Sequence, residues 1–109
     1  MAPGLDLDEA IDDYLGHLKV ERGLAANTIT AYASDLRRFA GFVVEAGIDT
    51  AGEVQTPLVL RYLSGLVDDG LSARSQARLL VAVRGLFKYL RRENLVPTDP
   101  TRTVSLPKF

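Results

Sequence analysis

The chain has 109 residues, of which 47% are hydrophobic and 25% charged, with a net charge of −1, a single histidine and no cysteine. This composition is typical of one globular domain with a modest core, and the lack of cysteine excludes a disulfide framework, a thiolate nucleophile and a cysteine-based zinc site. The first twenty residues are too acidic for a signal peptide and no apolar run is long enough to cross a bilayer, so we expect a cytoplasmic protein without a membrane role.

Apolar residues recur at steps of three and four, and almost no segment alternates as a strand would, so four amphipathic helices are predicted. The first is expected from about Leu7 to Val20, with Asp6 as its N-cap and Glu9 completing a capping box. The second is expected from about Asn27 to Glu45, and the glycine two residues beyond it is a typical helix terminator.

The third helix is predicted from Thr56, its expected N-cap, to about Asp69, with Pro57 at the one helical position where proline is well tolerated. Three apolar residues are expected to line its inner face: Leu60, Leu63 and Val67. The fourth helix has the cleanest helical period. It is predicted to begin after the N-cap Ser72 and to run to about Glu93, with Gly70 and Asn94 as the terminators of the third and fourth helices.

The chain is predicted to contain one domain. Residues 1–4 are expected to form an N-terminal tail, residues 5–96 the domain, and residues 97–109 an extended linker, because prolines recur in that last segment. Short loops between the helices favour a compact antiparallel arrangement. The predicted fold class is therefore all-α, a four-helix bundle.

Basic residues are concentrated in the second half of the chain. Residues 1–60 hold ten acidic and four basic side chains, a net charge of −6, whereas residues 61–109 hold nine basic and four acidic ones, a net charge of +5. On a helical wheel, four bases of the fourth helix lie opposite its apolar face: Arg74, Arg78, Lys88 and Arg92. Such a stripe suits the phosphates and base edges of DNA, although a basic helix face can also be merely solvated.

Two small residues, Val81 and Gly85, lie on the same outer stripe and are expected to let another body approach the backbone of the fourth helix. The outer face of the second helix carries small polar and basic side chains, which would also allow a close approach to a phosphate backbone. Asn27 and Thr28 could donate to a phosphate there, but helix capping is their expected primary role.

No catalytic constellation is found in the sequence. His17 has no second histidine or cysteine to share a metal with, and it is expected to be a surface residue. The carboxylates of Asp8, Asp12 and Asp13 lie on one side of the first helix, where solvation and the helix dipole explain them. We predict neither a metal nor a cofactor, and no enzymatic activity for this chain.

Three segments carry a family resemblance. They are the stretch from Leu24 to Val43, LAANTITAYASDLRRFAGFV, the stretch from Ser72 to Asn94, SARSQARLLVAVRGLFKYLRREN, and the Asp-Pro and Leu-Pro-Lys motifs of the C-terminal segment. In these the chain resembles the N-terminal core-binding domain of the tyrosine recombinase (phage integrase) family, most of all its Xer (XerD-like) branch.

The resemblance implies a four-helix, SAM-like core-binding domain that forms one half of a C-shaped clamp around duplex DNA. The second and fourth helices would face adjacent major grooves, and the first would lie toward neighbouring subunits. The DNA-binding residues implied on the two helices are Asn27, Thr28, Thr30, Ser34, Arg38, Ser72, Arg74, Ser75, Arg78, Arg84 and Lys88.

The resemblance also implies that the catalytic residues belong to a second domain following Phe109, and that the full protein cuts and rejoins DNA through a 3′-phosphotyrosine without a metal or an energy cofactor. The implied partners are double-stranded DNA at a recombination site, the protein's own C-terminal catalytic domain, and other recombinase subunits in a tetramer. Chromosome dimers, plasmids, phages and transposons all stay open as substrates. The main alternative function is a helical protein-interaction module that docks an acidic partner.

Overall fold

The computed structural model describes residues 4–105. Over these residues it contains four α-helices and one short 3-10 helix: α1 (Leu7–Val20), α2 (Ala26–Glu45), η1 (Ala51–Glu53), α3 (Thr56–Asp68) and α4 (Ala73–Arg92). This part of the chain has no strand, only an isolated bridge between Asp6 and Thr50, and none of its helices is both long and apolar enough to traverse a bilayer. The all-α prediction is confirmed, and each helix begins and ends within one residue of its expected position.

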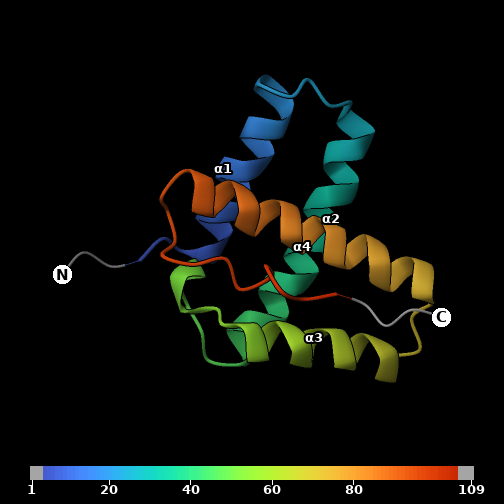
Figure 1. Ribbon diagram of the computed structural model, residues 1–109. Coiled ribbons are helices and arrows are strands. Elements are labelled where there is room, and N and C mark those ends of the chain that lie inside the picture. Colours follow the sequence, from blue (N-terminus) through green and yellow to red (C-terminus); the bar gives the residue numbers. More distant parts are fainter. Residues whose placement is uncertain (1–3, 106–109) are drawn as a thin grey trace.

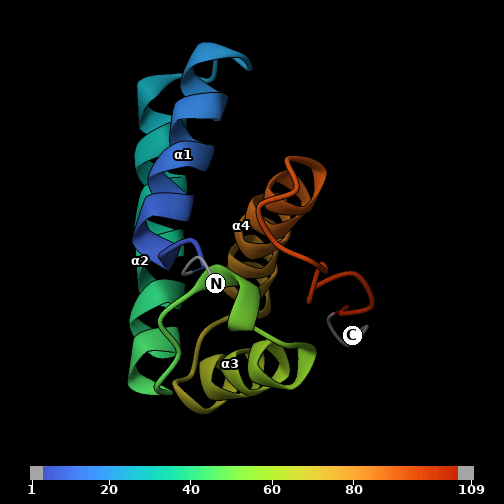
Figure 2. The same cartoon turned by 90° about the vertical axis from the view of Figure 1, so that its left-hand side faces the viewer.

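The helices form two hairpins that cross each other (Figure 1). α1 and α2 stand side by side as one antiparallel pair, while α3 and α4 run across them as the second pair (Figure 2). α2 and α4 each contact the other three helices, so these two helices form the centre of the fold. The four-helix prediction is therefore confirmed, and the crossing of the two pairs decides which face of each helix is covered.

The core lies where the two pairs cross. Phe39 of α2 and Phe87 of α4 are fully buried there, and their ring centroids lie 6.1 Å apart in an edge-to-face arrangement. The ring of Tyr62 from α3 packs edge-on against Phe39 with a centroid distance of 5.1 Å. Three helices thus meet around one aromatic cluster, a geometry that favours rings over aliphatic side chains alone.

The residues predicted to end the helices are confirmed more often than the residues predicted to begin them. Gly70 and Asn94 both adopt left-handed backbone conformations, with φ of 80° and 60°, as predicted for the terminators of α3 and α4. The N-cap prediction is confirmed for Ser72, whose side chain accepts a hydrogen bond from the backbone N–H of Ser75 at 3.1 Å. Asp6 precedes α1 but makes no side-chain capping bond, so the predicted capping box is wrong.

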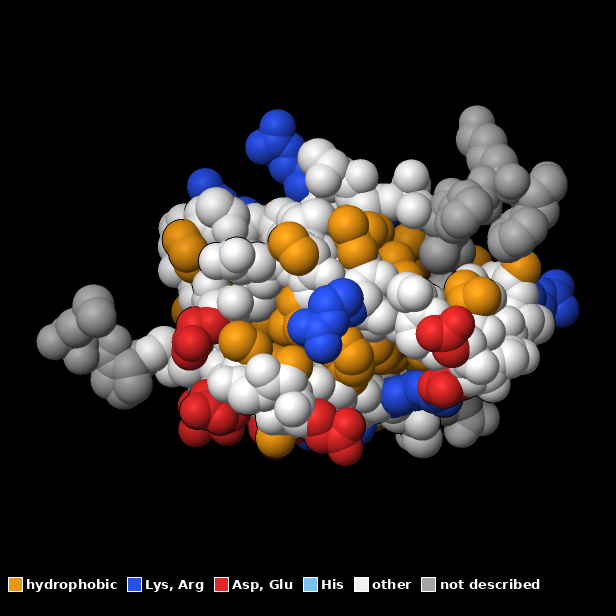
Figure 3. All heavy atoms as spheres, turned by 90° about the horizontal axis from the view of Figure 1, so that it is seen from below, with side chains coloured by type: hydrophobic (Ala, Val, Ile, Leu, Met, Phe, Trp, Pro, Cys, Tyr) orange, Lys and Arg blue, Asp and Glu red, His pale blue; other side chains and the backbone are white. Residues whose placement is uncertain are grey.

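The predicted inner face of α3 is also wrong in part. Leu60 and Val67 are 50% and 58% exposed, and only Leu63 of the three predicted residues is buried. The buried positions are Leu58, Val59, Tyr62, Leu63 and Leu66. The reason is that apolar residues occur around most of this helix, so their period alone does not select one face. Seen from the α3 side, hydrophobic side chains lie scattered among charged ones (Figure 3).

Residues 96–105 follow α4 without forming a further helix, and they pack on the side of α3 and α4 away from α1 and α2 (Figure 2). Val96, Thr101 and Val104 of this segment are buried. The hydroxyl of Thr56, the first residue of α3 and not its N-cap, donates to the carbonyl oxygen of Pro100 at 2.8 Å. The segment expected to be a linker is therefore docked against the helices as far as residue 104, and the boundary at residue 96 stays a prediction.

Candidate nucleic-acid interface

The basic residues of α4 lie at its surface. Arg74, Arg78 and Lys88 are exposed and Arg84 is half-buried, while the opposite side of the helix enters the core. Among the described residues, Arg74, Arg84 and Lys88 take part in no ion pair. These three cations are accordingly available to an external anion, and their role as DNA contacts stays a prediction.

The open approach expected at Gly85 is already filled by the chain itself. A Cβ atom added at Gly85 would lie well inside van der Waals contact with Oη of Tyr14 and 3.3 Å from its Cζ. Tyr14 comes from α1 and also stacks on Tyr89, with ring centroids 5.4 Å apart. The expectation that Gly85 lets another molecule approach α4 is wrong, because Tyr14 of α1 fills the space beside this glycine.

α2 presents its N-terminal half beside α4. The helix begins at Ala26 after Ala25, so Asn27 and Thr28 lie in its first turn and neither is the N-cap. Their predicted capping role is wrong, and both side chains are exposed. Ser34 is exposed too, whereas the hydroxyl of Thr30 donates to the carbonyl oxygen of Ala26 at 3.0 Å. Two polar side chains at the start of α2 are thus left facing solvent.

A groove of about 540 Å³ separates this part of α2 from α4. Its lining residues are Asn27, Thr28, Ala31, Tyr32, Asp35, Arg78 and Val81. The groove brings together three residues that were predicted as DNA contacts, although Arg78 follows Asn27 by more than fifty positions in the chain. We name this feature the α2–α4 groove.

At one wall of the α2–α4 groove, Arg78 is held by Asp35. The Nε and Nη2 atoms of the arginine donate to Oδ2 and Oδ1 of the carboxylate at 3.1 and 3.0 Å. The side chain of Asp35 is 7% exposed and that of Arg78 61% exposed. The hydrogen bond to Asp35 and the negative charge of that carboxylate raise the pKa of Arg78 above its ordinary value.

Sequence reasoning missed the role of Asp35. The available signal was its spacing: Asp35 precedes the core residue Phe39 by four positions and adjoins the buried Leu36, so it falls on the buried side of the helix. A carboxylate in that position requires a cationic or hydrogen-bonding partner.

Arg38 lies away from the α2–α4 groove. It lines a separate hollow of about 340 Å³ between α2 and α3, where its Nη2 atom lies 3.5 Å from Oδ2 of Asp69. The hydroxyl of Tyr62 reaches the same region, is buried, and has no hydrogen-bond partner among residues 4–105. Burial raises the pKa of Tyr62 to about 12, because the phenolate would be poorly solvated there.

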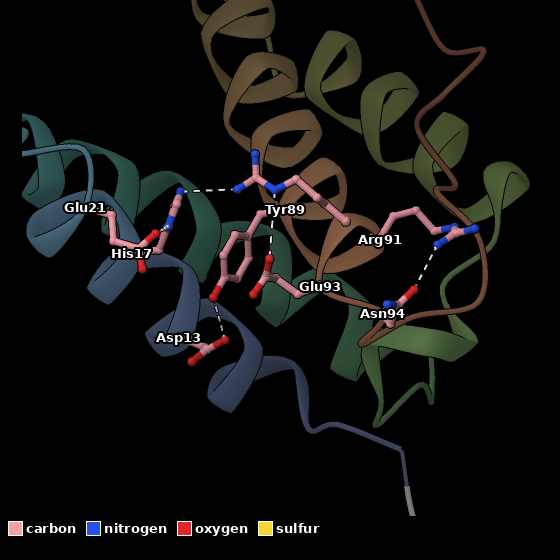
Figure 4. A network of polar contacts seen from close by, with 8 residues as sticks. Asp13, His17, Glu21, Tyr89, Arg91, Glu93 and Asn94 are labelled. Atoms are coloured by element: carbon pink, nitrogen blue, oxygen red, sulfur yellow. Dashed lines mark hydrogen bonds and ion pairs between the residues drawn. The ribbon is translucent and has the colours of Figure 1, made fainter.

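Three of the four acidic residues of α1 bind partners within the chain. Arg37 of α2 donates to Asp8 at 2.9 Å and to Asp12. Asp13 accepts a hydrogen bond from the hydroxyl of Tyr89 at 2.8 Å, which joins α1 to α4 (Figure 4). These contacts link α1 to α2 and α4, although the carboxylates of Asp8 and Asp12 stay largely exposed.

The predicted surface position of His17 is wrong. Its side chain is 12% exposed and lies against the Tyr89 ring with a centroid distance of 4.7 Å. Nδ1 is 2.9 Å from Glu21, and Nε2 faces Arg92 (Figure 4). Residues 4–105 contain no group of three histidine, cysteine or acidic side chains that could bind a metal ion. The contacts of His17 with Tyr89 and Arg92 join α1 to α4.

The chain matches a known family over most of its length. The family model described as "Phage integrase, N-terminal SAM-like domain" matches residues 11–94. Tyrosine recombinase XerD of Pseudomonas putida is 41% identical over 107 residues, which cover 98% of this chain and 35% of that protein. Tyrosine recombinase XerD of Staphylococcus aureus is 32% identical over 103 residues, which cover 94% of this chain and 35% of that protein.

A solved structure has the same fold. The crystal structure of the N-terminal domain of a phage integrase/site-specific recombinase from Haloarcula marismortui superposes with a TM-score of 0.86 at 23% identity, covering 97% of this chain and 100% of that one. The helical arrangement is therefore shared with that domain. The chain corresponds to 35% of the length of the two XerD relatives.

Proposed function

Because the chain belongs to the phage integrase N-terminal SAM-like domain family, we propose that it binds double-stranded DNA as one half of the clamp of a site-specific tyrosine recombinase. The observation that carries the proposal is a row of exposed or half-buried bases on α4 that form no ion pair within the described part of the chain: Arg74, Arg84 and Lys88. Cations on one helix face that are free of carboxylates displace counterions from phosphates, which is the main source of affinity for duplex DNA.

The acidic half of the chain fits the same proposal. Two exposed carboxylates of α1 pair with Arg37, and a third accepts a hydrogen bond from Tyr89. The polar start of α2 lies across the α2–α4 groove from the bases of α4. A duplex that follows α4 would therefore meet hydroxyl and amide groups of α2 before it met the acids of α1.

The proposed contacts on α2 are Asn27, Thr28, Thr30, Ser34 and Arg38, and those on α4 and its N-cap are Ser72, Arg74, Ser75, Arg78, Arg84 and Lys88. Internal bonds already occupy some of them. Ser72 caps α4, the hydroxyl of Thr30 is bound to the backbone, and Arg38 lies near Asp69. We assign the larger share of binding to the residues without such partners.

For the whole protein we propose DNA strand exchange by a catalytic domain outside this chain, with other recombinase subunits as partners on the DNA and chromosome dimers as the substrate that the Xer resemblance favours. The similarity to two proteins named tyrosine recombinase XerD supports this. In this proposal the 109-residue chain positions DNA, performs no chemistry, and works in the cytoplasm beside the chromosome.

The proposal is tested by fluorescence anisotropy with the 109-residue chain and a labelled duplex of about 30 base pairs, over a series of salt concentrations. We expect a dissociation constant of roughly 10⁻⁴ to 10⁻⁶ M, which is typical of non-specific contacts, or a lower one. The affinity should fall steeply as the salt concentration rises. Single-stranded DNA of the same length is the control and is expected to bind more weakly. Absence of duplex binding at low salt would contradict the proposal and favour a protein-interaction module.

A further inference from the structure

The pair of Asp35 and Arg78 differs from the other ion pairs of the protein. Arg37 binds the exposed carboxylates of Asp8 and Asp12, and Arg38 lies near the exposed Asp69. Among the described residues, only Arg78 is bound by a buried carboxylate. A buried carboxylate has few alternative positions, so it fixes the orientation of the guanidinium that it binds.

The geometry of the pair leaves one edge of the guanidinium free. Arg78 uses Nε and one Nη2 hydrogen toward Asp35, which leaves both Nη1 hydrogens and the second Nη2 hydrogen. These remaining donors point away from the carboxylate, along the end of the planar group. Because the arginine side chain is mostly exposed and lines the α2–α4 groove, this edge is accessible from outside.

The buried carboxylate of Asp35 requires a partner, but neither net stability nor simple charge attraction accounts for the exposed edge of the Arg78 guanidinium. A buried ion pair is often no more stabilising than an apolar pair of the same volume. An arginine whose charge is balanced by a carboxylate also contributes little to counterion release at phosphates. The pair does fix the orientation of the Arg78 guanidinium. The free end of that planar group can then donate to two acceptors that lie in one plane.

We propose that Asp35 is a positioning residue that holds Arg78 to read a guanine in the major groove. The inference rests on the proposed binding of duplex DNA. The O6 and N7 atoms of guanine are two coplanar acceptors, and end-on binding by arginine is the commonest specific contact with a base edge. The exposed Val81 lines the groove beside Arg78, where it would contact a base edge without competing for its acceptors.

The test is selection of duplexes with a randomised central segment by the 109-residue chain, followed by sequencing of the retained DNA. We expect guanine to be enriched at one position, with roughly a 5- to 150-fold affinity difference against other bases there. Arg78→Lys keeps the charge but removes the two-pronged edge, so it is expected to abolish that enrichment. Asp35→Asn is expected to reduce the enrichment, because an amide cannot accept two charge-assisted bonds from the guanidinium.

Arg61→Lys is the matched control, since Arg61 is an exposed arginine of α3 outside the proposed DNA contacts, and it is expected to keep the guanine preference. Thermal melting shows which variants fold. If the Asp35→Asn variant does not fold, the base preference of the Arg78→Lys variant tests the inference. Retained preference in Arg78→Lys, a wild-type chain without preference, or a loss of affinity equal for all sequences would each overturn the inference. In each of these outcomes the wild-type chain still binds duplex DNA, whereas failure of the wild-type chain to retain any duplex would overturn the proposed function itself.

Discussion

Replacement of Gly85 by alanine probes the contact between α1 and α4 directly. In the middle of a helix this change ordinarily stabilises the fold by about 1 kcal/mol, because alanine loses less conformational entropy than glycine. Here the new methyl group meets the hydroxyl of Tyr14 and lies 3.3 Å from Cζ of that ring. Tyr14 is buried and its ring packs at a tilt against Tyr89, so relief of the clash requires the ring to shift against that neighbour.

Overpacking of this kind costs about 1–3 kcal/mol. After subtraction of the helix-propensity gain, Gly85→Ala is expected to destabilise the protein by about 0–2 kcal/mol. Gly16→Ala is the matched control, since Gly16 lies inside α1 with open space around its Cβ position. The two variants should differ by about 1–3 kcal/mol, which corresponds to a urea midpoint difference on the order of 1 M.

The same substitution in a Tyr14→Phe variant tests whether the tyrosine hydroxyl causes the loss of stability. Tyr14→Phe removes the hydroxyl that the new methyl group would strike, so in that background Gly85→Ala is expected to become neutral or slightly stabilising. The coupling free energy from the resulting double-mutant cycle should fall in the range of about 0.5–3 kcal/mol. If Gly85→Ala raised stability in the wild-type background as much as Gly16→Ala does, the close approach of Tyr14 to α4 would be refuted.

Three further predictions concern the core, the interface and alkaline pH. Leu86→Ala should cost roughly 2–5 kcal/mol in urea unfolding because Leu86 is fully buried, whereas the exposed Val81→Ala should change stability by less than about 0.5 kcal/mol. Arg74→Ala should weaken duplex binding and reduce the slope of log K against log salt by about one unit, with an unchanged melting temperature. Because Tyr62 and Tyr89 have pKa values raised from 10.0 to about 12, the free energy of unfolding should fall as pH rises from 10 to 12, and Tyr62→Phe should flatten that fall.

Each of these has an outcome that contradicts it. A small loss in Leu86→Ala would place that side chain outside the core, and an unchanged salt slope in Arg74→Ala would remove Arg74 from the interface. The sign of the alkaline effect follows from the proton: tyrosine in the unfolded chain loses it near pH 10, while the folded protein retains it to about pH 12. Stability that stayed constant over this range would mean that the two hydroxyls titrate as in water.

The sequence by itself determined the local structure. The period of apolar residues located four helices, and residue types with special backbone preferences located several of their ends, as with Ser72 before α4 and Asn94 after it. It also identified the exposed bases of α4, because a long helix with one clean apolar face has only one side to turn toward solvent. These properties depend on neighbours within one or two helical turns.

Only the tertiary structure decided which faces were covered and which charges were paired. α3 has apolar residues around most of its surface, so the crossing of the two hairpins selected Tyr62 and left Leu60 exposed. Asp35 and Arg78 are 43 positions apart, and Tyr14 reaches Gly85 from a different helix. Local pattern carries no information on such contacts, because they depend on how rigid helices pack against one another and not on the residues that form each helix.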